Sequence, residues 1–263
     1  MNESRARCRR NRQPRKISGA KAASSELIMM LDARVGNRDR STRDWESALY
    51  CDVRKIDKTS LEIEVKLRIT DLPGIVVKLK RLGAICHGRV REQNTLFDTA
   101  DSAFHRSGRL LRVRIETAAP VNELPGGRMQ AVLTSKAPPP DASMAPGKIR
   151  RRYKARAERE LSLAAPAEFI HRLPSLGLRP GFRYEKLRTR FRYRGLHLDL
   201  DETPVGPFLE LEGQPRAIDR AARALGFAQI DYIRETYWDL YAADCRRRGV
   251  APKNMLLHAR KSR

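Results

Sequence analysis

The sequence LEIEVKLR, at residues 61–68, alternates an apolar with a charged side chain at every position. This two-residue period is typical of a β-strand with one apolar face and one charged face. It places Glu62, Glu64 and Lys66 on the same face. The same alternation returns far downstream in FLELEG, at residues 208–213. The two pairs of carboxylates, one from each strand, could converge on one hard cation, because such ions prefer oxygen ligands.

Most of the chain after residue 59 repeats this kind of pattern. Its mostly alternating segments are bounded by glycine, proline or aspartate, which are typical turn residues. The segments that predict strands are residues 60–69, 93–98, 108–116, 129–136, 155–163, 183–194, 196–201 and 206–213. Charged inner positions favour a closed antiparallel barrel, because closure removes exposed edges and about eight strands leave room for a ligand. We therefore expect an α+β fold in which a closed eight-stranded antiparallel β-barrel forms a tunnel and helices pack outside it.

Four stretches between the predicted strands predict helices. The first begins at Asp71, a good N-cap that is followed by a proline in the first turn, and it ends at Gly83. The others cover residues 166–176, 215–225 and 230–241. Pro174 is expected to bend or end the second helix.

The chain has 263 residues and a formal net charge of +23, and much of the basicity lies at its two ends. Residues 1–58 carry 15 Lys and Arg against eight Asp and Glu, whereas residues 246–263 carry seven Lys and Arg and no acidic residue. Residues 1–58 show no sustained period, so we expect disorder there, with a short helix near residues 25–33. The expected regions are this basic extension, a tunnel domain at 59–244 and a basic tail at 245–263.

The basic extension has two interpretations. It could tether the protein to a nucleic acid or another anionic surface. It could also be a passive extension, or the product of a start codon placed too far upstream. The passive interpretation is favoured, because no aromatic residues interleave with the arginines to stack on bases.

Cysteine usage and hydropathy bear on the compartment. The four cysteines are scattered without metal-ligand spacing, which favours a reducing cytoplasm. No apolar run is long enough to span a bilayer. A cytoplasmic protein without a membrane partner is therefore expected.

Every predicted strand except the second offers charged side chains on one side. Arginine can bind phosphate oxygens bidentately and lysine acts as a point charge, whereas carboxylates would bind Mg²⁺ or Mn²⁺. For any single strand, the same alternation also fits a face in contact with water. The order along the chain favours a site for phosphate and metal: acid pair, arginine pair, lysine, Arg-Glu-Glu, Lys-Arg, Asp and a second acid pair.

With these motifs the sequence resembles the CYTH superfamily, also called triphosphate tunnel metalloenzymes. The resemblance begins at the Glu-x-Glu-x-Lys signature, Glu62 to Lys66, and ends near Tyr241. It includes EQNTLFDT at 92–99, LLRVR at 110–114, LTSK at 133–136, YEKLR at 184–188 and LDLDETPVGPFLELE at 198–212. Within the superfamily, the sequence is most similar in these segments to bacterial class IV adenylate cyclases.

The resemblance implies roles for twelve residues. The metal-binding carboxylates that it implies are Glu62, Glu64, Asp201, Glu210 and Glu212. The catalytic residues that it implies, which also bind the triphosphate, are Lys66, Arg112, Arg114, Lys136, Lys186 and Arg188. Arg156 lies on a matching strand and is counted with the substrate-binding residues. Asp199 shares a face with Asp201, and the sequence does not decide which of the two binds the metal, for which Mg²⁺ or Mn²⁺ is expected.

The implied function is that of a metal-dependent enzyme that holds a triphosphate in the tunnel. The leading expectation is a class IV adenylate cyclase, in which the ribose 3′-hydroxyl attacks the α-phosphorus and ATP gives cyclic AMP and pyrophosphate. If water attacks the γ-phosphorus instead, the enzyme is a triphosphatase of inorganic tripolyphosphate, thiamine triphosphate or a nucleoside triphosphate. The third alternative is a non-catalytic module that binds polyphosphate or nucleic acid, although interleaved carboxylates would weaken such binding.

The expected partner is therefore ATP or another triphosphate compound. Nucleic acid is not required, and a homodimer is compatible with the sequence. No general base is evident, because the five histidines do not cluster in sequence. His197 shares a face with Asp199 and could touch the tunnel, but a surface or packing role is favoured. Tyr184 and Phe208 are expected to pack in the core or at the rim.

Overall fold

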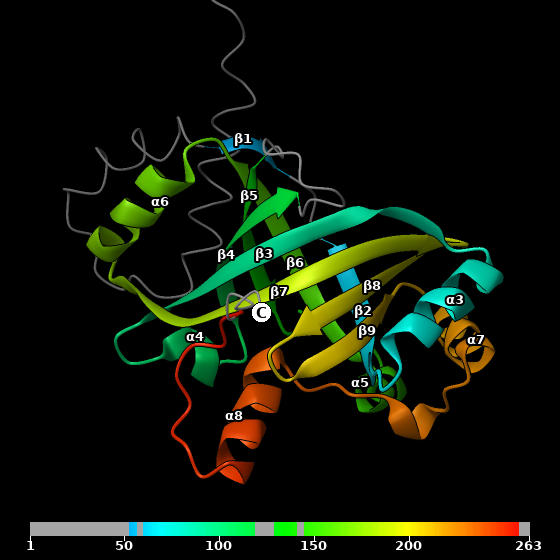
Figure 1. Cartoon of the computed structure of the whole chain (residues 1–263). Coiled ribbons are helices and arrows are strands. Elements are labelled where there is room, and N and C mark those ends of the chain that lie inside the picture. Colours follow the sequence, from blue (N-terminus) through cyan, green and yellow to red (C-terminus); the bar gives the residue numbers. More distant parts are fainter. Residues whose placement is uncertain (1–52, 57–59, 119–128, 141–144, 258–263) are drawn as a thin grey trace, which may run out of the picture. The chain divides into compact units, whose positions relative to one another are not determined.

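The computed structural model describes residues 53–56, 60–118, 129–140 and 145–257 (Figure 1). The expected helix at residues 25–33 lies outside them. Nine described strands form one antiparallel sheet in the order β1-β6-β2-β9-β8-β7-β3-β4-β5. They are β1 (Val53–Ile56), β2 (Ser60–Arg68), β3 (Ile85–Thr99), β4 (Leu110–Ala118), β5 (Gln130–Ala137), β6 (Lys154–Leu163), β7 (Leu178–Tyr193), β8 (Leu196–Thr203) and β9 (Gly206–Glu212).

The sheet closes on itself because β6 pairs with β5 as well as with β2. Strands β2 to β9 therefore form a closed eight-stranded antiparallel barrel, which confirms the predicted fold class. Strand β1 lies within the expected N-terminal extension. It pairs with the far end of β6, from Val53 opposite Leu163 to Ile56 opposite Leu161, and so continues the line of β2.

Three of the four predicted helices form where the sequence places them. Helix α3 (Leu72–Leu82) begins after Asp71, whose side chain accepts a hydrogen bond from the Gly74 amide, and it ends at Gly83, whose φ of 85° suits glycine. Helix α6 (Pro166–Arg172) passes into the 3₁₀ turn η2 (Leu173–Leu176) at Pro174. Helix α7 (Pro215–Leu225) follows β9. Two short helices, α4 (Ala103–Arg106) and α5 (Gly147–Arg152), complete the connections.

The prediction of a helix at residues 230–241 is wrong for the first half of that range. A 3₁₀ turn, η3 (Gln229–Asp231), comes first, and helix α8 (Tyr237–Arg247) begins only after Thr236. Thr236 and Asp239 form a reciprocal capping box, because the threonine hydroxyl accepts from the Asp239 amide and the aspartate accepts from the Thr236 amide. This cap sets the start of the helix, which the apolar period alone does not reveal.

The C-terminal region completes two strand edges that the barrel itself leaves unpaired. Pairing of β2 with β6 stops at Glu64, and beyond it Ile233 exchanges two backbone hydrogen bonds with Lys66. Pairing of β7 with β8 begins at Leu187, and before it Met255 bridges to Tyr184. A strand edge that is covered without hydrogen-bond partners is costly, and these two contacts supply the missing partners. They thereby attach the C-terminal region to the barrel.

The hydrophobic core lies between the barrel wall and the helices, not inside the barrel. Residues of β2 and β9 pack outward against α3 and α7, which lie side by side in Figure 1. The main contributors are Val65, Leu67, Leu209, Leu211, Ile75, Leu79, Ile218 and Leu225, all at most 4% exposed. The apolar face of each alternating strand is therefore the outer one, and the charged face turns inward.

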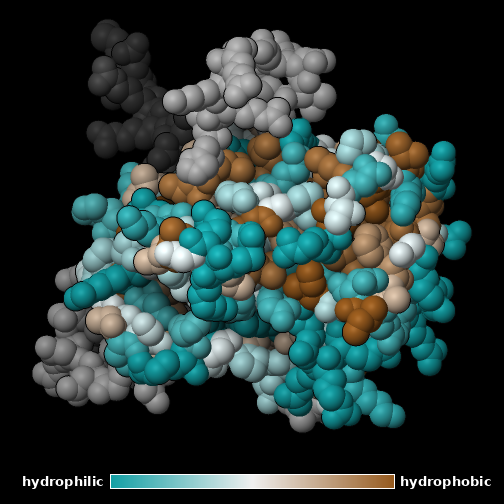
Figure 2. Space-filling model, turned by 60° about the horizontal axis from the view of Figure 1, so that its bottom comes forward, coloured by the Kyte–Doolittle hydropathy of each residue, from teal (hydrophilic) through white to brown (hydrophobic). Residues whose placement is uncertain are grey.

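The outer surface is mainly hydrophilic on the face shown in Figure 2, with hydrophobic residues in separate patches. In the described residues, none of the helices combines the length and the apolar character that crossing a membrane requires.

Candidate active site

The interior of the barrel is a cavity of about 1060 Å³. Eleven of the twelve predicted site residues line it, which the period of two explains, because all of them occupy the inner face of their strands. They are Glu62, Glu64, Lys66, Arg112, Arg114, Lys136, Arg156, Lys186, Arg188, Glu210 and Glu212. Asp201 is the exception: it is fully buried and does not line the cavity, whereas Asp199 does.

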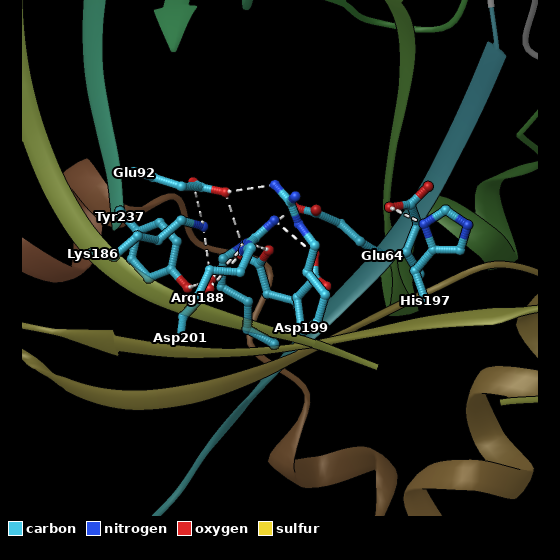
Figure 3. A network of polar contacts seen from close by, with 12 residues as sticks. Glu64, Glu92, Lys186, Arg188, His197, Asp199, Asp201 and Tyr237 are labelled. Carbon is cyan, nitrogen blue, oxygen red and sulfur yellow. Dashed lines mark hydrogen bonds and ion pairs between the residues drawn. The ribbon is translucent and has the colours of Figure 1, made fainter. Parts of the chain in front are cut away.

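Asp201 lies behind the lining, where it holds three other groups in place (Figure 3). Its carboxylate accepts hydrogen bonds from Lys186 Nζ at 2.8 Å, from Arg188 Nε and Nη2 at 2.7 Å each, and from the Tyr237 hydroxyl at 2.6 Å. Both oxygens are thus occupied by protein donors. This environment differs from the open metal ligand that the sequence resemblance implies, and it suits an anchor for cationic side chains.

Arg188 connects this anchor to the cavity. It also contacts Glu210 and forms an ion pair of 2.7 Å with Asp199. Burial alone would lower the pKa of Arg188, but the carboxylates of Asp199 and Asp201 hold that pKa well above its usual value. Arg188 therefore stays charged inside the barrel, with its three nitrogens held by Asp199, Asp201 and Glu210.

Glu92, which is not among the predicted site residues, is a second buried anchor. Its carboxylate is fully buried and lies 3.3 Å from Arg114 Nη1, 3.4 Å from Lys186 Nζ and 3.5 Å from Arg188 Nε. Burial would raise the pKa of Glu92, but Arg114 and Arg188 hold it well below its ordinary value. Strand β3 begins at Ile85, whereas the predicted strand begins at 93, so the prediction leaves out Glu92, which alternates with Asn94.

On another part of the wall, carboxylates crowd one another. Burial raises the pKa of Glu62 to about 7, and the neighbouring Glu64 adds to this rise while Lys136 opposes it. Burial likewise raises the pKa of Glu212 to about 8, with Glu62 adding to the rise. Burial, reinforced by the neighbouring carboxylates, thus makes the charged forms of Glu62 and Glu212 unfavourable, and a bound divalent cation would favour those forms.

Glu64 differs from its neighbours because three lysines surround it. Lys154 Nζ lies 2.7 Å and Lys66 Nζ 3.0 Å from the same oxygen, Oε1. Burial would raise the pKa of Glu64, but Lys154, Lys66 and Lys136 hold it well below its usual value. Lys154 also lines the cavity, yet the predicted strand began at 155 and missed it.

The arginines of β4 extend the cationic lining. Arg112 donates hydrogen bonds to the Tyr184 hydroxyl at 3.2 Å and to Thr134 at 3.1 Å, while its buried Nε has no hydrogen-bond partner among the described residues. Arg114 Nε donates to Asn94 Oδ1 at 3.0 Å. Tyr184 therefore both packs in a hydrophobic cluster and orients a cation, which is more than the packing role expected of it.

Two further predicted groups lie at the periphery of the cavity. Arg156 donates to the Gly108 carbonyl at 2.8 Å, so it is tied to the connection that precedes β4. His197 lines the cavity and is partly exposed, with Nδ1 3.9 Å from Glu212. Burial and the nearby Arg192 lower the pKa of His197, which leaves it mainly neutral at pH 7.

The oxygen donors fit Mg²⁺ or Mn²⁺ by their chemistry, because hard divalent cations prefer carboxylates. In the part of the chain that the structure describes, no three acidic, histidine or cysteine side chains already surround a common point as ligands. The carboxylates instead contact lysines and arginines. At Glu62 a bound metal would therefore have to displace Lys136.

Comparison with known proteins agrees with this geometry. A CYTH domain model matches residues 60–237, and the chain belongs to this family. No curated protein matches the chain.

The fold is similar to those of several solved structures. A candidate adenylate cyclase from Vibrio parahaemolyticus is 16% identical with a TM-score of 0.55, and the match covers 70% of this chain and 98% of that one. The PH1819 protein of Pyrococcus horikoshii is 21% identical with a TM-score of 0.56, covering 70% and 99%. The PH1012 protein of the same organism is 23% identical with a TM-score of 0.52, covering 68% and 98%. At these identities the likeness concerns the fold alone.

Proposed function

We propose that this protein is a metal-dependent enzyme that binds a triphosphate inside the barrel and acts as an adenylate cyclase. The observation that carries the proposal is that a row of lysines and arginines lines the same cavity as a group of crowded carboxylates. Cations suit the oxygens of a phosphate chain, and carboxylates suit the metal that accompanies it. A plain anion-binding surface would gain nothing from the carboxylates.

The phosphate-binding residues in this proposal are Lys66, Arg112, Arg114, Lys136, Arg156, Lys186 and Arg188. Two of them, Lys186 and Arg188, contact the buried anchors Asp201 and Glu92. These anchors fix the cations before substrate arrives, so little reorganisation remains when charge develops on the phosphoryl oxygens. Arg112 offers its unpartnered Nε in the same way.

The metal-binding residues in this proposal are Glu62, Glu64 and Glu212, with Glu210 beside them. When bound, Mg²⁺ or Mn²⁺ would neutralise charge on the phosphate oxygens. Lys136 and Lys154, which now contact Glu62 and Glu64, would then be free to contact phosphate. Asp201 is proposed as a positioning residue, because its oxygens are already occupied.

The cyclase reaction follows if the barrel holds ATP with its ribose 3′-oxygen in line with the α-phosphorus. A bond forms from O3′ to the α-phosphorus, the bond from the α-phosphorus to the bridging oxygen breaks, and pyrophosphate leaves. The hydroxyl proton passes to water. The protein contributes by fixing the chain with its cations, so proximity and charge stabilisation supply the rate.

A triphosphatase is the second candidate, and the charged lining favours it. A cavity lined by ionised groups retains water, because unpaired buried charges are costly. A water molecule in line with the γ-phosphorus would release orthophosphate from ATP or from inorganic tripolyphosphate. The two activities differ only in which nucleophile is aligned.

Product analysis tests the proposal and separates the two reactions. The protein is incubated with ATP, and separately with tripolyphosphate, in Mg²⁺, Mn²⁺ or chelator, and the products are identified by mass spectrometry. Metal-dependent cyclic AMP and pyrophosphate are expected. Orthophosphate without cyclic AMP would identify a triphosphatase. No turnover, with binding that persists in chelator, would indicate a non-catalytic polyphosphate-binding module.

A further inference from the structure

One end of the cavity has a different chemistry from the charged interior. Phe182 of β7 and Trp238 of α8 both line it, and their ring centroids lie 4.9 Å apart at an interplanar angle of 67°. Both side chains are partly exposed. Because both side chains line the cavity and keep part of their surface exposed, a further ring can pack against the pair.

Phe182 is held from two further sides. Its ring stacks on Tyr184 with a centroid distance of 5.5 Å and on Tyr241 with one of 5.8 Å. The ring is therefore fixed by its neighbours, whereas Trp238 extends from the first turn of α8. A rigid aromatic surface binds a flat group at low cost in conformational entropy.

The aromatic end adjoins the phosphate-binding residues directly. Tyr184, which stacks on Phe182, accepts a hydrogen bond from Arg112, and Tyr237 lies next to Trp238 in the chain with Lys186 Nζ 5.0 Å from its ring centre. A molecule whose phosphates contact Arg112 and Lys186 can thus extend its other end toward Phe182 and Trp238. Lys253 and Asn254 also line the cavity, and the backbone of each is hydrogen-bonded to the hydroxyl of Tyr241, the ring on which Phe182 stacks.

The C-terminal segment that supplies these two residues is firmly attached. Met255 is 1% exposed, and its backbone accepts from the Glu185 amide and donates to the Arg183 carbonyl, both at 2.9 Å. The side chain of Asn254 accepts from the Arg183 amide at 3.0 Å, and its carbonyl accepts from the Tyr241 hydroxyl at 3.2 Å. The segment is therefore built into this end of the barrel. Trp238 and residues 253–255 lie beyond the part of the chain that matches the family, which ends at 237.

We propose that Phe182 and Trp238, with the side chains of Lys253 and Asn254, form a subsite for the flat aromatic group of an organic triphosphate. The aromatic pair would stack on the ring, and the two polar side chains would contact its edge or the adjoining sugar. The proposal rests on the proposed function, because it takes the phosphate chain to lie on the barrel cations. It assigns the substrate to the class of aromatic triphosphates, such as nucleotides, in preference to inorganic tripolyphosphate.

Tryptophan fluorescence tests the subsite without relying on turnover. The chain contains two tryptophans, Trp45 and Trp238, so in the full-length Trp45→Phe protein the emission reports Trp238 alone. ATP or tripolyphosphate is added with Mg²⁺ by rapid mixing. A change of emission with ATP that tripolyphosphate does not cause is expected. Equal changes with both compounds, or none with ATP, would overturn the subsite.

Substitution provides the second test. In Trp238→Ala we expect kcat/KM for ATP to fall about tenfold, a typical cost of losing one base-stacking contact, and in Trp238→Phe to fall much less. The inhibition constant of tripolyphosphate against ATP turnover should stay within about twofold, which also shows that the barrel is folded. Phe182→Leu should repeat the pattern of Trp238→Ala.

The outcomes separate the subsite from the proposed function. Equal weakening of ATP and tripolyphosphate in these variants would mean that the aromatic pair only packs, and the subsite would be rejected while the triphosphate site stands. Wild-type protein that acts on tripolyphosphate and not on ATP would reject the subsite and identify a triphosphatase. Wild-type protein that neither binds nor converts either compound would reject the proposed function and the subsite with it.

Discussion

Lys136 Nζ lies 2.6 Å from each of the two carboxylate oxygens of Glu62, although the two residues come from strands β5 and β2, which are separated by β6. A proposed phosphate ligand thus forms an ion pair with a proposed metal ligand over the intervening strand β6. The contact pairs the two charges inside the buried cavity, and while it persists neither side chain is free to contact another ligand. If metal and triphosphate bind together, Glu62 would contact the metal and Lys136 would contact a phosphate oxygen. Two better matched ion pairs would then replace the present one. The arrangement explains how a lining of opposite charges can fold before substrate binds.

Glu62→Gln should reduce metal-dependent turnover by at least about 100-fold, because an amide is a poor ligand for a hard cation. The fold should persist, since glutamine has the same shape and can still accept a hydrogen bond from Lys136. The measurements are turnover over a range of Mg²⁺ concentrations and the thermal midpoint. Glu168→Gln, at an exposed position of α6, is the matched control and should retain wild-type turnover. Wild-type turnover in Glu62→Gln would remove this residue from the metal site.

Lys186→Ala should weaken binding of the triphosphate, and it should also lower stability. Lys186 is 1% exposed, and its removal leaves the buried carboxylates of Asp201 and Glu92 with one cation fewer. Breaking a buried ion pair in this way costs about 3–5 kcal/mol. KM for ATP and urea unfolding measure the two effects. Lys80→Ala, at an exposed position of the outer helix α3, should change neither by much, and an unaltered KM in Lys186→Ala would exclude the residue from phosphate binding.

Asp201→Asn distinguishes an anchor of cations from a metal ligand. The four donors around Asp201 would lose their negative partner, so we expect a loss of stability of about 3–5 kcal/mol and a raised KM for the triphosphate. The Mg²⁺ concentration for half-maximal turnover should stay near that of the wild type. Glu64→Gln, by contrast, should raise that concentration. A large rise in the Asp201→Asn variant would restore the metal-ligand role that the sequence suggested.

Much of this site could be predicted from the sequence, because alternation assigns a strand residue to one face without knowledge of its neighbours. Glu62, Arg112 and Glu210 face the cavity for that reason alone. Alternation indicates which face of a strand a residue occupies but not how deeply its side chain is buried. It could therefore not distinguish Asp199, which lines the cavity, from Asp201, which lies behind the lining. Their difference depends on donors from β7 and α8.

The parts that were missed depend on contacts between distant segments. Lys154 is the first residue of β6, where pairing with β2 begins, and Glu92 lies inside β3, whose pairing with β7 extends back to Ile85, well before the predicted start at 93. The C-terminal tail carries no strand pattern, yet Met255 is buried because β8 stops short of Tyr184. Such gaps in a closed sheet follow from strand lengths and register, which local periodicity does not encode.

Stability of the metal-free protein should fall as the pH rises from 7 to 8. Glu62 and Glu212 have folded pKa values raised from 4.5 to about 7 and about 8, so between 4.5 and these values the folded state holds protons that the unfolded state has released. Their stabilising effect is therefore present at low pH and lost as the pH rises through 7 and 8. Glu64, whose folded pKa is lowered, loses its contribution only below about pH 4.5.

Thermal midpoints at pH 7 and 8, in chelator and in Mg²⁺, test this dependence. The fall with pH should be smaller in Glu212→Gln and smaller when Mg²⁺ is present, because a bound cation removes the advantage of the protonated form. The range lies above the pH at which His197 titrates, since its pKa is lowered. An identical pH dependence in Glu212→Gln would show that this carboxylate does not titrate as described.

Deletion of residues 253–263 should impair both stability and ATP turnover. The deletion removes Met255 from the hydrophobic cluster of Tyr184, Phe208 and Tyr237, and it exposes the backbone of β7 where β8 has ended. Loss of a buried methionine side chain alone costs about 2–5 kcal/mol. Deletion of residues 258–263 is the matched control, because it leaves Met255 and its hydrogen bonds in place. Unfolding in urea and kcat/KM for ATP are the measurements. If both deletions behave like the full chain, the C-terminal segment does not hold this end of the barrel closed, and the proposed contribution of Lys253 and Asn254 to substrate binding fails as well.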